Sequence, residues 1–185
     1  MECGDLLIGQ LEFYWDYHLR PRLDGLTDDE YQWAPAQPSW TVHEDGTGQA
    51  VFDLEYPEPT PPPVPTIAWR LVHIGVGCFA IRWSTFFGDG NVPADADMFD
   101  PRHRPTDLPL TATDGLAFLD HWYERWHDAI RGLDEQALWK PLGPKGGQYA
   151  DDPMLALITH LNREVMHHGA EICLLRDLYR AGAAR

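Results

Sequence analysis

Five titratable side chains share one face of the region 151–181, DDPMLALITHLNREVMHHGAEICLLRDLYRA. At 100° per residue they fall, together with leucines, within a band about 100° wide: Leu157, His160, Glu164, His167, His168, Glu171 and Leu175. A bundle helix normally buries this side, and an unpaired buried charge is unfavourable by several kcal/mol. Residues four apart lie one turn apart, a distance that one divalent ion can bridge. The pattern therefore predicts a metal site, although hydrogen-bonded Glu–His pairs would also satisfy it.

A third candidate ligand lies in the apolar region 66–87, TIAWRLVHIGVGCFAIRWSTFF. His73 shares one helical face with five apolar residues: Trp69, Val72, Val76, Ala80 and Trp83. Such an imidazole either bonds a neighbour across the core or joins the acidic and imidazole side chains of the last helix. Because that helix already offers Glu and His, the metal interpretation is favoured.

Four segments with helical periodicity must position these residues: 3–20, 66–87, 113–132 and 151–181. Thr66 is the expected N-cap of the second. Thr113 or Asp114 is the expected cap of the third, and Asp151 or Asp152, with Pro153 in the first turn, is expected to open the fourth. Thr27 and Glu30 have the spacing of a capping box before a short helix.

Two irregular segments connect the helices. Residues 35–65 are rich in proline, which excludes helix there, and residues 49–54 alternate enough for a short strand or hairpin. Residues 88–109 have no periodicity. We therefore expect an all-α protein, a four-helix bundle with long irregular crossover loops, formed as a single domain over residues 1–185.

Composition narrows the classes of partner. The chain has 185 residues, with 29 acidic against 14 basic side chains and a formal net charge of −15. Nucleic acids and anionic membranes require clustered Lys and Arg, so we expect neither as a partner and predict a small-molecule substrate.

The N-terminal region has no basic segment followed by an apolar one, and no apolar run is long enough to span a membrane. Three cysteines without a CxxC motif favour reduced thiols, and we expect a cytoplasmic protein.

Two motifs resemble the DinB/YfiT-like metalloenzyme family of four-helix bundles. One is a histidine after a tryptophan in the second helix, here Trp69 to His73. The other is HLNREVMHHGAEI, residues 160–172, which is similar to the family pattern H-x-x-N-H-x-x-H-H-R-G-Q-[IL]. The resemblance covers most of the chain in helix order.

The resemblance implies a metal, nickel or zinc, held by one histidine of the second helix and two histidines of the fourth. Transferred by position, the ligands are His73, Glu164 and His168, with Glu164 in place of a family histidine. Two His and one carboxylate suit Zn²⁺, Ni²⁺, Fe²⁺ or Mn²⁺. The alternative set of His160, Glu164 and His168 spans about 12 Å, too far for one ion. We therefore expect His160 and His167 to support the ligands or line the cavity.

The resemblance further implies thiol-dependent transferases and isomerases that use mycothiol, bacillithiol or glutathione as cosubstrate. We therefore predict a metal-dependent S-transferase, with hydrolysis as the other chemistry that such a site permits. The alternative is a non-catalytic bundle, a binding or stress-response protein that lost its ion when Glu164 replaced histidine. A homodimer through exposed tryptophans is compatible with both. Arg70 and Arg163 could bind a substrate carboxylate, but we expect both on the helix surface.

Overall fold

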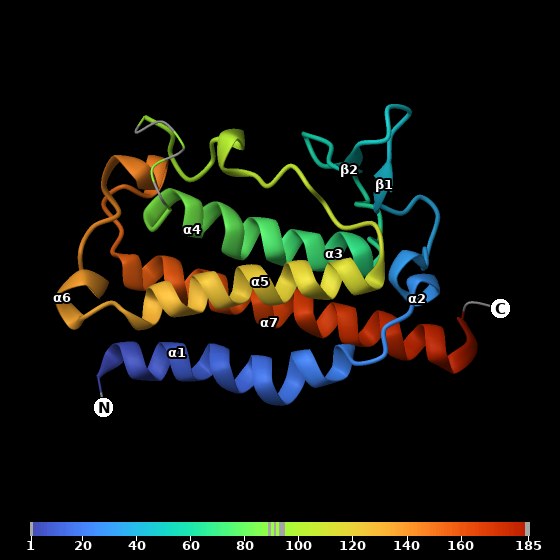
Figure 1. The fold of residues 1–185 in the computed structure, drawn as a ribbon, viewed down its shortest axis with the longest axis horizontal. Helices are drawn as coiled ribbons and strands as arrows, with labels where there is room; N and C mark the ends of the chain where they lie inside the picture. Colours follow the sequence, from blue (N-terminus) through green and yellow to red (C-terminus); the bar gives the residue numbers. More distant parts are fainter. Residues whose placement is uncertain (1, 89, 91, 93–94, 184–185) are drawn as a thin grey trace.

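The computed structural model describes residues 2–88, 90, 92 and 95–183, and four long helical segments dominate it (Figure 1). The first comprises α1 (Cys3–Tyr14) and a π-helical turn, Trp15–Leu19. The second joins α3 (Ile67–His73), a π-helical stretch (Ile74–Ala80) and α4 (Ile81–Phe86) without a break. The third is α5 (Ala112–Arg131). The fourth is α7 (Met154–Leu178), which continues into a π-helical turn, Tyr179–Ala183. The predicted all-α bundle is confirmed.

Shorter elements lie in the connections. These are α2 (Asp28–Gln32), α6 (Glu135–Leu138) and 3-10 turns at Arg20–Leu23, Pro101–His103 and Gly143–Tyr149. The proline-rich segment contains an antiparallel hairpin of β1 (Val42–Glu44) and β2 (Ala50–Phe52), in which Val42 faces Phe52. The strand expected within 49–54 is therefore present, as one arm of this hairpin.

Helix starts follow side-chain capping, with two corrections. Thr66 accepts a hydrogen bond from the Trp69 N–H, and the Thr27–Glu30 capping box is formed, both as predicted. Helix α5 is capped by Thr111, which has extended backbone and accepts the Asp114 N–H, so Thr113 and Asp114 lie inside the helix. Helix α7 has Pro153 as its N-cap residue and begins at Met154, one residue later than predicted.

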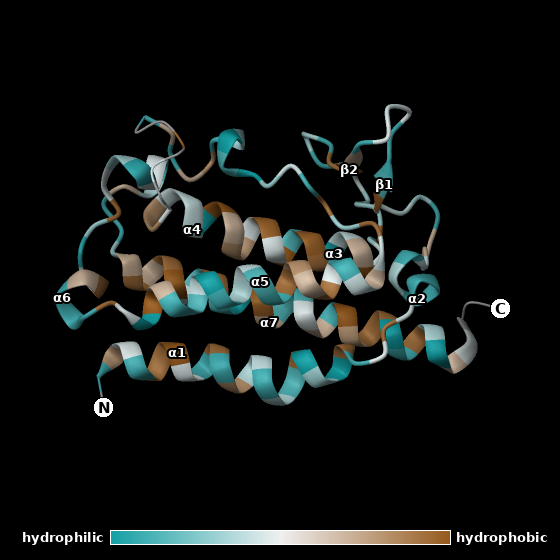
Figure 2. Ribbon diagram, in the orientation of Figure 1, coloured by the Kyte–Doolittle hydropathy of each residue, from teal (hydrophilic) through white to brown (hydrophobic). Residues whose placement is uncertain are grey.

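The core lies where the four segments face one another. Helix α3 packs on both α5 and α7, and α1 packs on α7 and α5. The fully buried apolar side chains come from all four segments and include Leu19, Leu71, Phe79, Trp126 and Val165. In Figure 2, α3 and α4 are mostly hydrophobic, whereas the visible side of α5 is mostly hydrophilic. The second segment is accordingly buried over much of its length, from Ile67 to Ile81.

A buried ion cluster ties α2 to the C-terminal part of α7. Glu30 is paired with Arg176 at 3.2 Å and with Arg180 at 2.6 Å, and the side chains of Glu30 and Arg176 are only 4% and 2% exposed. Arg176 also donates to the backbone carbonyls of Arg22 and Asp24. Burial raises the pKa of Glu30, but hydrogen bonds from Arg176, the Thr27 N–H and Arg180 outweigh it and leave the pKa below its ordinary value.

None of the described helices is both long and apolar enough to cross a membrane.

Candidate metal centre

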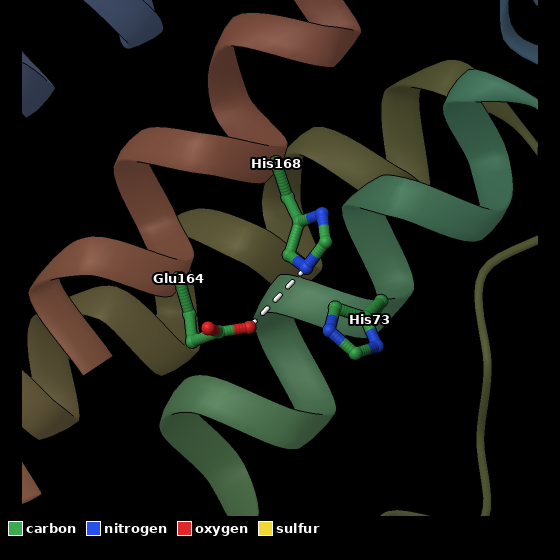
Figure 3. A group of neighbouring side chains, drawn as sticks. All are labelled: His73, Glu164 and His168. Carbon is green, nitrogen blue, oxygen red and sulfur yellow. Dashed lines mark ion pairs between the residues drawn. The ribbon is translucent and has the colours of Figure 1, made fainter. Parts of the chain in front are cut away.

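Helices α3 and α7 bring together the three side chains that were predicted as ligands (Figure 3). His73 is the last residue of α3, and Glu164 and His168 lie one turn apart on α7. Each side chain offers one donor atom, and these atoms all lie within 4.8 Å of one another. Within this group, His168 Nε2 lies 3.3 Å from Glu164 Oε2. The sequence neighbours Glu164 and His168 thus meet a residue about 90 positions earlier in the chain.

The donor set fits a divalent ion. Ligand atoms about 2.0–2.2 Å from a tetrahedral ion are about 3.4 Å apart, close to the 3.3 Å between His168 Nε2 and Glu164 Oε2. Donors on opposite sides of an ion would be about 4.4 Å apart at most. Small side-chain rotations would therefore bring all three atoms, now within 4.8 Å, to bonding distance of one ion. Glu164 is 31% and His168 12% exposed, so the centre is open to solvent on the Glu164 side.

His168 is oriented by a carboxylate on its other ring nitrogen. Its Nδ1 lies 2.7 Å from Glu171 Oε2, on the next turn of α7. Arg70 from α3 is in turn paired with Glu171, with Nε and Oε2 3.0 Å apart. When Nδ1–H donates to Glu171, the Nε2 lone pair is directed at Glu164 and the centre, as in a carboxylate–histidine–metal arrangement. An imidazolium at this position would instead donate to both carboxylates without any metal.

His73 is held by aromatic stacking. Its ring is parallel to the Trp69 indole, 5.0 Å away, and its other neighbour, His168, lies edge-on at 4.5 Å. The indole N–H of Trp69 donates to the Asp53 carbonyl at 2.7 Å, which connects the site to the segment after β2. Burial lowers the pKa of His73 to about 3, with further contributions from His168 and Arg70. The imidazole therefore stays neutral near pH 7 and keeps a lone pair for a metal.

His160 and His167, the predicted supporting residues, lie at different distances from the centre. His167 is 67% exposed, stacks on the His168 ring at 4.9 Å and has Nε2 3.5 Å from Glu171 Oε1. His160 is exposed, and its Nδ1 lies 3.1 Å from Nη2 of Arg163. It lines a separate cavity of about 410 Å³ between α4 and the start of α7. Their contribution to metal binding stays a prediction.

Sequence reasoning misplaced Arg70 and overlooked the role of Glu171. Arg163 is exposed, as expected, but Arg70 is only 17% exposed and contacts both Glu171 and His168. The error has a physical reason, since Arg70 lies on the side of α3 that packs against α7 and its charge is met by a carboxylate there. Glu171 did belong to the predicted stripe, and its three-residue spacing from His168 was the available signal.

The protein's own cysteines are poor candidates for a nucleophile. Burial raises the pKa of Cys78 to about 12, and the charge of Glu164 contributes. Burial also raises the pKa of Cys173. Both side chains therefore remain protonated thiols at neutral pH, and neither Cys78 nor Cys173 is expected to supply a reactive thiolate.

Comparison with known proteins assigns the family. The sequence model of the DinB superfamily matches residues 49–172, about two thirds of the chain. The chain belongs to the DinB superfamily. Comparisons with curated proteins and with solved structures give no significant match. The matched range includes His73, Glu164, His168 and Glu171, so the whole candidate centre of this DinB-like chain lies within the family region.

Proposed function

We propose that this DinB-like protein is a metal-dependent enzyme acting on an electrophilic small molecule. Its reaction is the transfer of a low-molecular-weight thiol or a hydrolysis. The supporting observation is the convergence of His73, Glu164 and His168, whose donor atoms all lie within 4.8 Å. A divalent ion bound there, Zn²⁺, Ni²⁺, Fe²⁺ or Mn²⁺, would lower the pKa of a coordinating thiol or water molecule and so supply a nucleophile at neutral pH.

The residues of this chain have separable tasks in that reaction. The 2.7 Å contact with Glu171, shorter than the 3.1 Å contact with Arg70 Nη1, favours a proton on Nδ1 of His168, which leaves Nε2 available as a ligand atom. Arg70 neutralises Glu171 and fixes its position. Trp69 supports the plane of His73. Cys78 and Cys173 stay protonated and are poor sources of a thiolate. The thiol of the proposed transferase reaction is therefore taken as a cosubstrate, for which glutathione, mycothiol and bacillithiol are the candidates.

The alternative is a DinB-like bundle that binds no metal and catalyses no reaction. One observation favours it. The 3.3 Å Glu164–His168 contact and the 2.7 Å His168–Glu171 contact would satisfy an imidazolium on both sides. In that case Glu164 is the structural partner of His168 and a chelator has no effect on stability.

The amount of bound metal distinguishes the metal-dependent enzyme from the non-catalytic bundle. Protein purified without a metal-affinity tag is incubated with Zn²⁺, Ni²⁺, Fe²⁺ or Mn²⁺, desalted and measured by elemental mass spectrometry. We expect about one ion per chain, lost in Glu164→Ala and in His168→Ala. His121→Ala is the control, because it removes an exposed histidine of α5 and should retain the ion. A wild-type chain without metal under all four conditions would contradict the enzyme proposal. Metal-loaded protein is then assayed for consumption of each thiol.

A homodimer also remains a proposal, but exposed tryptophans alone would give it little contact surface. Trp139 is the one tryptophan among the large apolar side chains that are strongly exposed in the described part of the chain. More apolar surface lies on the outer sides of the first helical segment and of α7, where the exposed side chains are Leu6, Phe13, Tyr17, Leu174 and Leu178. Sedimentation at several concentrations tests for a dimer, and Phe13→Ser should weaken one that uses this surface.

A further inference from the structure

A cavity of about 560 Å³ lies against the candidate centre and shares His73 with it. Its walls come from three parts of the chain that are distant in sequence. They are the face of the second helical segment around Val76, strand β2, and the irregular segment 101–108 (Figure 1). The walls are mostly apolar, with Phe52 and Leu108 on the sides opposite the helix. Ligand cavities of proteins commonly have this size and character.

The second helical segment contains two neighbouring glycines, of which packing requires Gly75 but not Gly77. A Cβ at Gly75 would lie 2.6 Å from Phe118 Cε1, so the contact with α5 requires a glycine there. A Cβ at Gly77 would have His73 Cε1 as its nearest neighbour, at an ordinary 3.9 Å. Glycine inside a helix is destabilising relative to alanine, and nothing in the described packing requires it at position 77. The absent side chain keeps room open beside His73.

The cavity has one cationic side chain. Arg104 lines it from the 101–108 segment, and the lining contains no carboxylate. No described acidic residue lies within ion-pair distance of Arg104, whereas the nearby Arg102 is paired with Asp100 at 2.5 Å. Arg104 is exposed, and in a chain with a net charge of −15 an arginine at the edge of an apolar cavity, with no described carboxylate within ion-pair distance, is a local site for an anion.

We propose that this cavity binds a small molecule with an apolar body and one anionic group, such as a carboxylate or sulfonate. The apolar body lies against Val76 and Gly77, the anionic group lies at Arg104, and the remaining end is directed at His73. As the substrate subsite of the enzyme, this inference rests on the proposed function. The cavity itself is formed by the protein alone, so binding can be measured without any metal.

The test uses two fluorescent probes with the same ring system. 1-Anilinonaphthalene-8-sulfonate carries one negative charge, and N-phenyl-1-naphthylamine is neutral. Each is titrated into the full chain after dialysis against EDTA, with circular dichroism as the check of folding. Gly77→Leu should weaken both probes about tenfold, because its side chain occupies their space. Arg104→Gln should weaken the sulfonate about fivefold and change the neutral probe less than about twofold.

Two matched controls locate the site. Gly9→Leu makes the same change inside α1, where a Cβ meets nothing within 4 Å, and should leave both affinities unchanged. Arg163→Gln removes a cation from the second cavity, of about 410 Å³. If Gly77→Leu fails to fold, Thr106→Trp fills the cavity from an exposed position on the opposite wall and should weaken both probes in the same way.

Three results would overturn the inference. They are no saturable binding to the wild type, affinities that neither cavity-filling variant changes, and loss of sulfonate binding in Arg163→Gln but not in Arg104→Gln. A chain that binds both probes as expected but no metal would retain the ligand site and lose the proposed enzyme. A chain that binds metal but neither probe would keep the metal centre of the proposed enzyme and contradict the proposed ligand site.

Discussion

Helix α7 carries two polar clusters that differ in how their charges are satisfied. Near its C-terminal end, Arg176 meets Glu30 and two backbone carbonyls, with side chains 2% and 4% exposed. About two turns earlier, His168 meets Glu164, Glu171 and His73 in a centre that is partly open, with Glu164 31% exposed. Both clusters join α7 to an element from the first half of the chain.

The difference separates a structural cluster from a reactive one. At Glu30, opposite charges pair directly and the carboxylate itself is buried between two arginines, so no coordination position is left for an ion or a substrate. At His168, Arg70 neutralises Glu171, whereas Glu164, the neutral His73 and the other ring nitrogen of His168 form a set of electron-pair donors that a cation would complete. Stability is therefore expected to depend on the first cluster and metal binding on the second.

The largest expected effect is on stability, from Arg176→Met. This change leaves the buried Glu30 carboxylate without its main partner and should lower the free energy of unfolding by about 3–5 kcal/mol. Urea denaturation measures it, and metal content should stay unchanged where the variant is folded. Arg163→Met, an exposed arginine of the same helix, should change stability by less than about 0.5 kcal/mol. A loss below about 1 kcal/mol for Arg176→Met would remove the distinction between the clusters.

The next effect is on metal affinity, from His73→Ala. Loss of a ligand atom should weaken Zn²⁺ binding by more than about 100-fold, beyond the 10–100-fold typical for residues that only support ligands. Competition with a chelating dye gives the affinity. His121→Ala, an exposed histidine on α5, should bind Zn²⁺ like the wild type. Equal affinities for His73→Ala and wild type would exclude His73 as a ligand.

A smaller loss is expected from Glu171→Gln. The amide cannot hold the Nδ1 proton of His168 as a carboxylate does, so Zn²⁺ affinity should fall about 10–100-fold without being lost. The same dye competition applies. Asp177→Asn changes an acidic residue of α7 that is paired with the surface residue Arg22, and its affinity should equal that of the wild type. An unchanged affinity in Glu171→Gln would mean that His168 needs no orienting carboxylate.

The smallest effect is a pH dependence from Glu30. Because the pKa of Glu30 is below its ordinary value of 4.5 in the folded protein, its ionised form stabilises the fold fully above that pH. This contribution is lost as the pH falls through the folded-state pKa. The stability difference between the wild type and Glu30→Gln should therefore narrow below about pH 4.5, by about 1.4 kcal/mol per unit of pKa shift. Urea denaturation from pH 3 to 7 tests this, and a constant difference would contradict it.

Much of the architecture could be predicted from local sequence. The periodicity of residues 66–87 and 113–132, the caps at Thr27 and Thr66, and the proline-rich break depend on neighbours within a few positions. The start of α5 was predicted two to three residues late, because threonines at 111 and 113 are both good caps and only the backbone conformation distinguishes them. The position of Glu164 and His168 on one face of α7 followed from the helical period alone.

Tertiary structure determined features that cannot be derived from the helical period of the sequence. The sequence by itself determined which side chains could meet along a helix, including Glu164, His168 and Glu171. It could not determine that Arg70 turns inward to Glu171 or that His160 lies exposed, because both depend on how the second helical segment packs against α7. Nor could it reveal the open space at Gly77, since a cavity exists only between segments that are distant in sequence. Spacing is a local property of the chain, whereas burial, pairing and free volume are set by its long-range contacts.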